Sequence, residues 1–302
     1  MIIIGLSLFE IITSIDNAVI NAEVVKTMQP KARRWFITWG LFFSVFLVRG
    51  LLPLGILLLM IPGLDLSNIL SIGFSNNEVI EKSVEATAPL VLIGGGVFMV
   101  LLFFYWLFLE EKHFGLPKFE KFFIRQGLWF YTVTSLILSI LVWFAIKENP
   151  IMAFSAVAGS LIFFITNGFK HYAEHKEKEL QNSAKSDINK IIYLEIIDAS
   201  FSIDGVIGAF AFTFSIPLIL LGNGIGSVLV RQITMANVEK VSQYIYLKNG
   251  AMYSILVLGI FMILESFKIH VPVWGAPLAT VVIIVFFFLK SRKHIKLSAL
   301  TG

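Results

Sequence analysis

The sequence predicts an all-α fold: a polytopic membrane helix bundle of about nine transmembrane helices that contains an inverted internal repeat. Three observations lead to this prediction: the composition, the spacing of long apolar stretches, and the charge of the loops between them. Hydrophobic residues make up 57% of the 302-residue chain and charged residues only 15%, whereas a soluble domain has about 25% charged residues. The chain is therefore too apolar for a soluble domain.

Apolar stretches of about 20 residues, enough to cross the hydrocarbon core of a bilayer, recur along the whole chain. The predicted spans are 2–27, 35–62, 88–110, 128–146, 150–169, 190–214, 216–236, 251–267 and 272–289. The span 190–214 is the least apolar, because acidic residues interrupt it.

The loops between these spans alternate in charge. Basic residues gather in 26–34, 112–125, 170–190 and 231–248 and in the tail, while the intervening loops are neutral or acidic. Lysine and arginine collect in cytoplasmic loops, so the alternation places the N-terminus outside and the C-terminus in the cytoplasm. We expect a location in a bacterial plasma membrane. The net charge of +4 belongs to these loops and does not indicate a nucleic-acid partner.

The first and sixth spans resemble each other. The first contains FEIITSIDNAVINA and the sixth EIIDASFSIDGVIGAF. When Asp16 is aligned with Asp204, Glu10 falls on Asp198, and the predicted directions of the two spans are opposite. Inverted repeats with a binding site near the membrane midplane are typical of secondary transporters.

This repeat divides the chain into three parts. The first repeat half, with helices 1–3 and their loops, is 1–127. Connecting helices 4–5 and a cytoplasmic loop occupy 128–189, and the second half, with helices 6–9 and the basic tail, occupies 190–302.

Carboxylates inside apolar spans carry the functional prediction. An Asp at a helix centre costs about 2.5–3.5 kcal/mol on insertion scales, and intramembrane acids are functional by default. The acids concerned are Glu10, Asp16, Glu195, Asp198 and Asp204. The alternative is that they make only structural hydrogen bonds between helices. We expect them to meet around a bound cation near the midplane.

The ligand types indicate a hard cation. The chain has no cysteine, and its histidines lie in loops, at span borders or in the tail. Carboxylate, amide and hydroxyl oxygens suit Mn²⁺, Ca²⁺ or Mg²⁺. Asn21 and Ser202 are expected accessory ligands, because Asn21 shares a helical face with Glu10, and Ser202 with Asp198.

Helical spacing leaves two alternatives for the S-I-D triplets. Asp16 and Asp204 point about 120° away from the face of the other acids on a regular helix. Either the helices are unwound at S-I-D, which exposes backbone carbonyls as ligands, or these two acids face different neighbours.

Arg49 and Arg231 are arginines within predicted spans. Arg49 either neutralises or gates the acids when the site is empty, or pairs structurally with one of them. Arg231 lies nearer a span end, where its side chain can extend to the membrane surface.

The motif EIITSIDNAVINA resembles the first-helix motif of the TerC family of integral membrane proteins, and DASFSIDGVIGAF resembles its second-half motif. The resemblance extends from the first helix to about Gly259. It implies a relationship with LysE-type exporters and with proteins linked to manganese export and tellurium resistance. The metal ligands that it implies are Glu10, Asp16, Asn17, Asp198 and Asp204, with Glu195 adjacent.

Three functional classes follow, and we favour the first. It is an exporter of a divalent cation, with Mn²⁺ as the bound substrate, rather than an enzyme. The second is a membrane metal-binding factor that assists metalation or insertion of other proteins without transporting the ion. The third is an intramembrane aspartyl protease, which the chain's lack of a GxGD context disfavours. The expected partners are the metal ion and the lipid bilayer.

Overall fold

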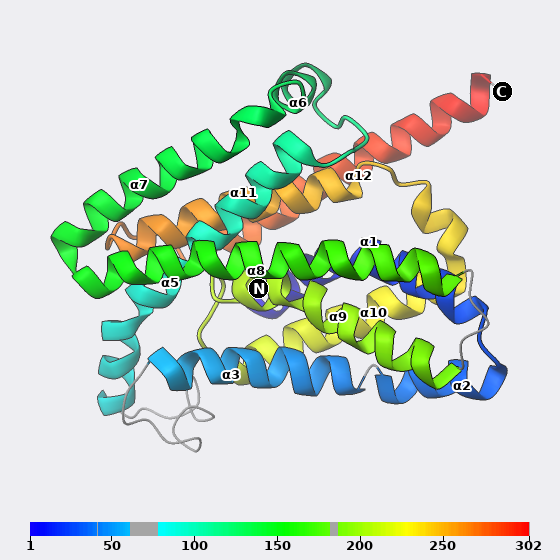
Figure 1. Cartoon of the computed structure of the whole chain (residues 1–302), viewed down its shortest axis with the longest axis horizontal. Helices are drawn as coiled ribbons and strands as arrows, with labels where there is room; N and C mark the ends of the chain where they lie inside the picture. Colours follow the sequence, from blue (N-terminus) through cyan, green and yellow to red (C-terminus); the bar gives the residue numbers. More distant parts are fainter. Residues whose placement is uncertain (41, 61–77, 182–186, 302) are drawn as a thin grey trace.

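The computed structural model describes residues 1–40, 42–60, 78–181 and 187–301 (Figure 1). All regular secondary structure in these ranges is helical. The α-helices are α1 (Ile2–Lys26), α2 (Pro30–Trp35), α3 (Arg49–Met60), α5 (Glu78–Leu109), α6 (Pro117–Ile124), α7 (Phe130–Glu148), α8 (Pro150–Gln181), α9 (Asp187–Ala209), α10 (Ile216–Ser242), α11 (Leu247–Ser266) and α12 (Gly275–Thr301). Two π-helical segments, η1 (Phe36–Gly40) and η2 (Phe43–Val48), precede α3, and one 3₁₀ turn, η3 (Gly127–Trp129), precedes α7.

Six segments of the described chain are long and apolar enough to cross a membrane. They are Ala86–Leu109, Gly127–Glu148, Pro150–Tyr172, Ile216–Ile233, Leu247–Ser266 and Gly275–Leu297. Their number and length identify an integral membrane protein and confirm the predicted all-α membrane class.

The other three predicted spans differ from these six. The span 2–27 becomes α1, whose described residues include the shorter apolar stretch Ile2–Ser14. The described residues of the span 35–62 lie mainly in η1, η2 and α3. Most of the span 190–214 lies in α9, whose acidic residues lower its hydropathy. The described chain thus supports six of the nine predicted spans on length and composition.

The apolar core lies between α5, α8, α11 and the start of α1. Trp106, Phe98 and Phe103 of α5 are completely or almost completely buried in it. In contrast, α7 lies along the outer edge of the bundle (Figure 1), with large apolar side chains such as Trp143 and Leu136 exposed. Such an outward apolar face fits a helix surrounded by lipid.

Close helix approach in the core depends on glycine. A Cβ added at Gly159 of α8 would lie 2.0 Å from the carbonyl oxygen of Gly94 of α5. A Cβ added at Gly96 would lie 2.9 Å from the carbonyl oxygen of Gly259 on α11. Small residues that bring backbones together are the usual means of packing membrane helices.

A buried carboxylate that could not be recognised in the sequence links α6 to α11. Glu120 of α6 is fully buried and accepts hydrogen bonds from the backbone N–H of Leu116 (2.9 Å), the Asn249 amide (3.1 Å) and the Tyr253 hydroxyl (3.1 Å). These hydrogen bonds hold α6 and the residue before it against α11.

The S-I-D triplets lie within regular α-helix in both α1 and α9. The predicted alternative of unwound helices at these positions is therefore wrong. The π-helical segments occur elsewhere, in η1 and in η2, and η2 ends directly before Arg49. π-Helical turns are rare and are often found at functional sites.

Candidate functional site

Glu10 lies at the crossing of α1, α9 and α10 and is completely buried. Glycines on both neighbouring helices leave the space for its side chain. A Cβ added at Gly205 of α9 would lie 2.7 Å from Oε2 of Glu10, and one at Gly226 of α10 would lie 2.7 Å from its Cβ. The Glu10 side chain thus packs directly against the backbones of α9 and α10.

Arg49, at the start of α3, binds this carboxylate. Its Nη2 and Nε lie 2.6 Å and 2.8 Å from Oε1 of Glu10. The hydroxyls of Ser14 and Ser227 donate to the same oxygen, at 2.7 Å and 3.0 Å. The second oxygen, Oε2, has no hydrogen-bond partner in the described part of the chain.

Asp198 of α9 lies between two guanidinium groups. Its Oδ2 is 3.7 Å from Nη1 of Arg49 and 3.8 Å from Nη2 of Arg231. Arg231 also donates to the Phe36 carbonyl oxygen at 3.1 Å, and its guanidinium lies 4.6 Å from the centre of the Phe36 ring. Arg231 therefore points inward instead of extending to the membrane surface as predicted.

Glu195 lies one helical turn before Asp198 on α9. Its Oε1 is buried without a hydrogen-bond partner among the described residues. A Cβ added at Gly40 of η1 would lie 2.1 Å from that oxygen, so the carboxylate rests on the backbone of the π-helical segment. Arg231 and Arg49 are both close enough to act electrostatically on Glu195.

These side chains form one group, which we call the arginine–carboxylate cluster: Glu10, Arg49, Glu195, Asp198 and Arg231. It joins α1, α3, α9 and α10. With every member ionised it has three negative and two positive charges.

Asp204 faces a different direction from Asp198. It forms an ion pair with Lys170 of α8, and its Oδ1 is buried without a hydrogen-bond partner among the described residues. Asp204 follows Asp198 by six residues, which rotates it by about 120° on a regular helix. Of the two predicted alternatives, the structure thus has the one in which this acid faces a different neighbour.

The remaining predicted ligands are placed as follows. Ser202 is buried, and its hydroxyl donates to the backbone carbonyl of Asp198 within α9. The side chains of Asp16, Asn17 and Asn21 lie outside the described residues, although the α1 backbone is described there. Among the described residues, no three His, Asp or Glu side chains are grouped so as to hold a metal ion.

Two residues of the site were missed in the sequence. Ser227 lies in α10, and an isolated serine in an apolar helix has no distinctive pattern. Lys170 directly follows the predicted span 150–169, where a lysine is expected to face water. Only the packing of α8 on α9 turns it toward Asp204.

Sequence comparison identifies the family. The chain belongs to the family described as "Protein of unknown function (DUF475)", whose model matches residues 15–296. No match was found in comparisons with curated proteins and with solved structures.

The predicted membership of the TerC family is wrong, because the matching model is that of DUF475. The motifs that carried the resemblance are short acidic segments of two helices and did not suffice to identify the family. The expectation of manganese export that the resemblance implied loses its support, and the function has to be argued from the site.

Proposed function

We propose that this member of the DUF475 family is a membrane transporter that exports a divalent cation, with Mn²⁺ as the first candidate. The observation that carries the proposal is the burial of Glu10 and Asp198 together, in contact with the guanidinium of Arg49. Buried charges inside membrane proteins are costly, and they mark substrate and ion pathways.

Arg49 acts in this proposal as a tethered substitute for the transported cation. Burying a carboxylate is tolerable only with a positive partner, and Arg49 provides it in the absence of substrate. The arginine–carboxylate cluster has a formal charge of −1 with Arg49 in place. Replacement of that guanidinium by a divalent cation brings the charge to zero, which favours a divalent over a monovalent ion.

The oxygen atoms of the cluster suit such an ion. Oε2 of Glu10 and Oε1 of Glu195 lack hydrogen-bond partners among the described residues, and the Ser14 and Ser227 hydroxyls border the Glu10 carboxylate. Carboxylate and hydroxyl oxygens are ligands for Mn²⁺, Mg²⁺ and Ca²⁺.

For a cation to replace Arg49, the guanidinium group has to move away from Glu10, which requires a change in the conformation of the helix that carries it. The π-helical segment η2 ends directly before Arg49, and a π-helical turn can shift the register of the residues after it. We propose that such a shift withdraws Arg49 from Glu10 when the cation enters.

The proposal includes nine crossings, a cytoplasmic C-terminus and location in a bacterial plasma membrane. It also includes the inverted repeat, around which the two halves would alternate in access. The repeat is supported by the aligned acids Glu10 and Asp198, which both contact Arg49. Arg231, in the corresponding span of the second half, also contacts Asp198.

Flux measurement in proteoliposomes tests the proposal. Wild-type protein should move Mn²⁺ down an imposed gradient, and Glu10→Gln should reduce the flux at least tenfold. Glu111→Gln is the matched control, because Glu111 is exposed beyond the end of α5, and it should retain wild-type flux.

Wild-type protein that binds Mn²⁺ without moving it would overturn the transporter proposal. That result would favour the alternative of a non-transporting factor that assists metalation or insertion of other proteins. Absence of both binding and flux would exclude both functions.

A further inference from the structure

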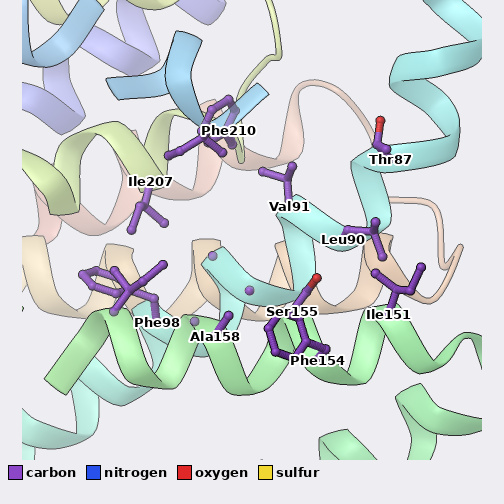
Figure 2. A pocket seen from close by; sticks show the side chains of 15 residues that line it. Thr87, Leu90, Val91, Phe98, Ile151, Phe154, Ser155, Ala158, Ile207 and Phe210 are labelled. Atoms are coloured by element: carbon purple, nitrogen blue, oxygen red, sulfur yellow. The ribbon is translucent and has the colours of Figure 1, made fainter. Parts of the chain in front are cut away.

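A cavity of about 460 Å³ lies between α3, α5, α8 and α9, and none of its described lining residues belongs to the arginine–carboxylate cluster (Figure 2). Its size is within the range of small-molecule sites, about 300–1,000 Å³. The described lining has no charged side chain, and only Thr87 and Ser155 contribute side-chain hydroxyls. The largest apolar lining side chains are the three phenylalanines Phe98, Phe154 and Phe210.

The length of the cavity lining is about half the thickness of a bilayer's hydrocarbon core. Its lining on α5 runs from Thr87 to Phe98 and on α8 from Ile151 to Ile162, about 16 Å along each helix axis. The hydrocarbon core of a bilayer is about 30 Å thick. The lining is therefore about as long as one leaflet of the hydrocarbon core is thick, and it lies in the N-terminal half of the apolar segments Ala86–Leu109 and Pro150–Tyr172.

The mouth of the cavity opens toward lipid. Phe154 is 72% exposed and Ile151 is 59% exposed, and both lie on membrane-crossing α8. Figure 2 shows the side chains of α9 across the cavity from those of α8. In the depth of the cavity, Phe98 and Phe210 are almost completely buried.

The molecules that surround the mouth of the cavity are the ones that can enter it. An apolar cavity does not hold water, and an empty one loses dispersion contacts along its walls. Within the bilayer, the molecules at the mouth are lipid acyl chains, whose apolar character and one-leaflet length match the lining.

We infer that one acyl chain of a membrane phospholipid occupies this cavity. The headgroup stays at the membrane surface, because the described lining offers it no charged partner. The chain lies against Ile207 and Phe210, which follow Asp204 by less than two helical turns. The bound chain thereby supports the end of α9, the helix that carries Glu195 and Asp198.

Photo-crosslinking tests this site. The protein is reconstituted with a phospholipid that carries a diazirine at the middle of one acyl chain, illuminated, and analysed by peptide mass spectrometry. We expect adducts on Phe98, Ile207 or Phe210, whose side chains are 1%, 6% and 2% exposed. Bulk lipid does not reach such side chains unless a chain enters the cavity.

Two variants and a matched control sharpen the result. Ala158→Phe fills the cavity from α8 and Leu90→Phe from α5, and each should reduce these adducts at least fivefold. Val157→Phe adds an aromatic ring at the neighbouring position, which is exposed and does not line the cavity, and should leave the adducts unchanged. Adducts on Trp143, exposed on α7, should persist in all variants and report correct insertion.

Adducts confined to exposed side chains in the wild-type protein would overturn the inference. So would cavity adducts that persist at the wild-type level in the inserted Ala158→Phe and Leu90→Phe variants. Both outcomes can be read without any transport measurement, so they are independent of the proposed cation site.

Discussion

Arg49 and Glu10 meet inside the bundle, with two guanidinium nitrogens 2.6 Å and 2.8 Å from a single carboxylate oxygen. The two residues come from α3 and α1, and both are at most 2% exposed. Arg49 also lies 3.7 Å from Asp198, so one side chain links the acids of α1 and α9.

Removal of Arg49 should destabilise the protein strongly. Arg49→Gln leaves buried carboxylates with one positive partner fewer, and breaking a buried ion pair costs about 3–5 kcal/mol. The Tm in detergent should fall by several degrees, and Arg49→Lys should recover part of the loss. An unchanged Tm in Arg49→Gln would mean that the ion pair does not contribute to stability.

Replacement of Gly226 should separate α1 from α10. A Cβ at this position would lie 2.7 Å from the Cβ of Glu10 and 2.7 Å from the Ser7 carbonyl oxygen. Since a backbone atom is involved, Gly226→Ala should cost about 1–3 kcal/mol through overpacking. Gly168→Ala is the control, because a Cβ there has no neighbour within 4 Å, and alanine has the higher helix propensity. Equal Tm values for both variants would contradict the close approach of α1 and α10.

The Glu120 network should contribute to stability and not to cation binding. Tyr253→Phe removes a hydroxyl that donates to a buried carboxylate at 3.1 Å, and hydrogen bonds to charged groups contribute about 1.5–3 kcal/mol. We expect a lower Tm with an unchanged Mn²⁺ affinity. A change in Mn²⁺ affinity would indicate that this end of the bundle is coupled to the arginine–carboxylate cluster.

Lys112, beyond the end of α5, should make stability depend on pH. Burial lowers the pKa of its ammonium group to about 8, although Glu120 and Glu110 oppose this shift. Between pH 8 and the ordinary lysine pKa of 10.5, the unfolded chain binds more protons than the folded one, so stability rises with pH. The Tm of the wild-type protein should therefore rise relative to Lys112→Met between pH 7 and pH 9.5. A difference in Tm that does not vary over this interval would be incompatible with a lowered pKa.

The sequence predicts the class of fold better than the number of spans. Composition and long apolar stretches suffice for an all-α membrane protein, and six segments meet the criteria of length and hydropathy. In α9, Glu195, Asp198 and Asp204 lower the hydropathy on which span prediction depends. The π-helical segments η1 and η2 lie against α9, and η2 also lies against α10; no local pattern in the sequence predicts either segment.

The site could be predicted in its residue types but not in its pairing. The intramembrane acids and Arg49 stand out in the sequence because they are costly in a bilayer. Helical spacing correctly separated Asp204 from Asp198. The partners of these acids could not be predicted from the sequence. Lys170 meets Asp204 and Ser227 meets Glu10 only because of the arrangement of α8 and α10.

The affinity for Mn²⁺ in the absence of Arg49 tests the central claim most directly. The free Mn²⁺ concentration can be followed by electron paramagnetic resonance as purified protein is titrated in detergent. If Arg49 occupies the place of the cation, Arg49→Gln should bind Mn²⁺ at least tenfold more tightly than the wild-type protein, a difference of about 1.4 kcal/mol. Glu10→Gln should bind it more weakly. Equal or weaker binding by folded Arg49→Gln, or no binding by any of the three proteins, would contradict the claim that a divalent cation replaces this arginine.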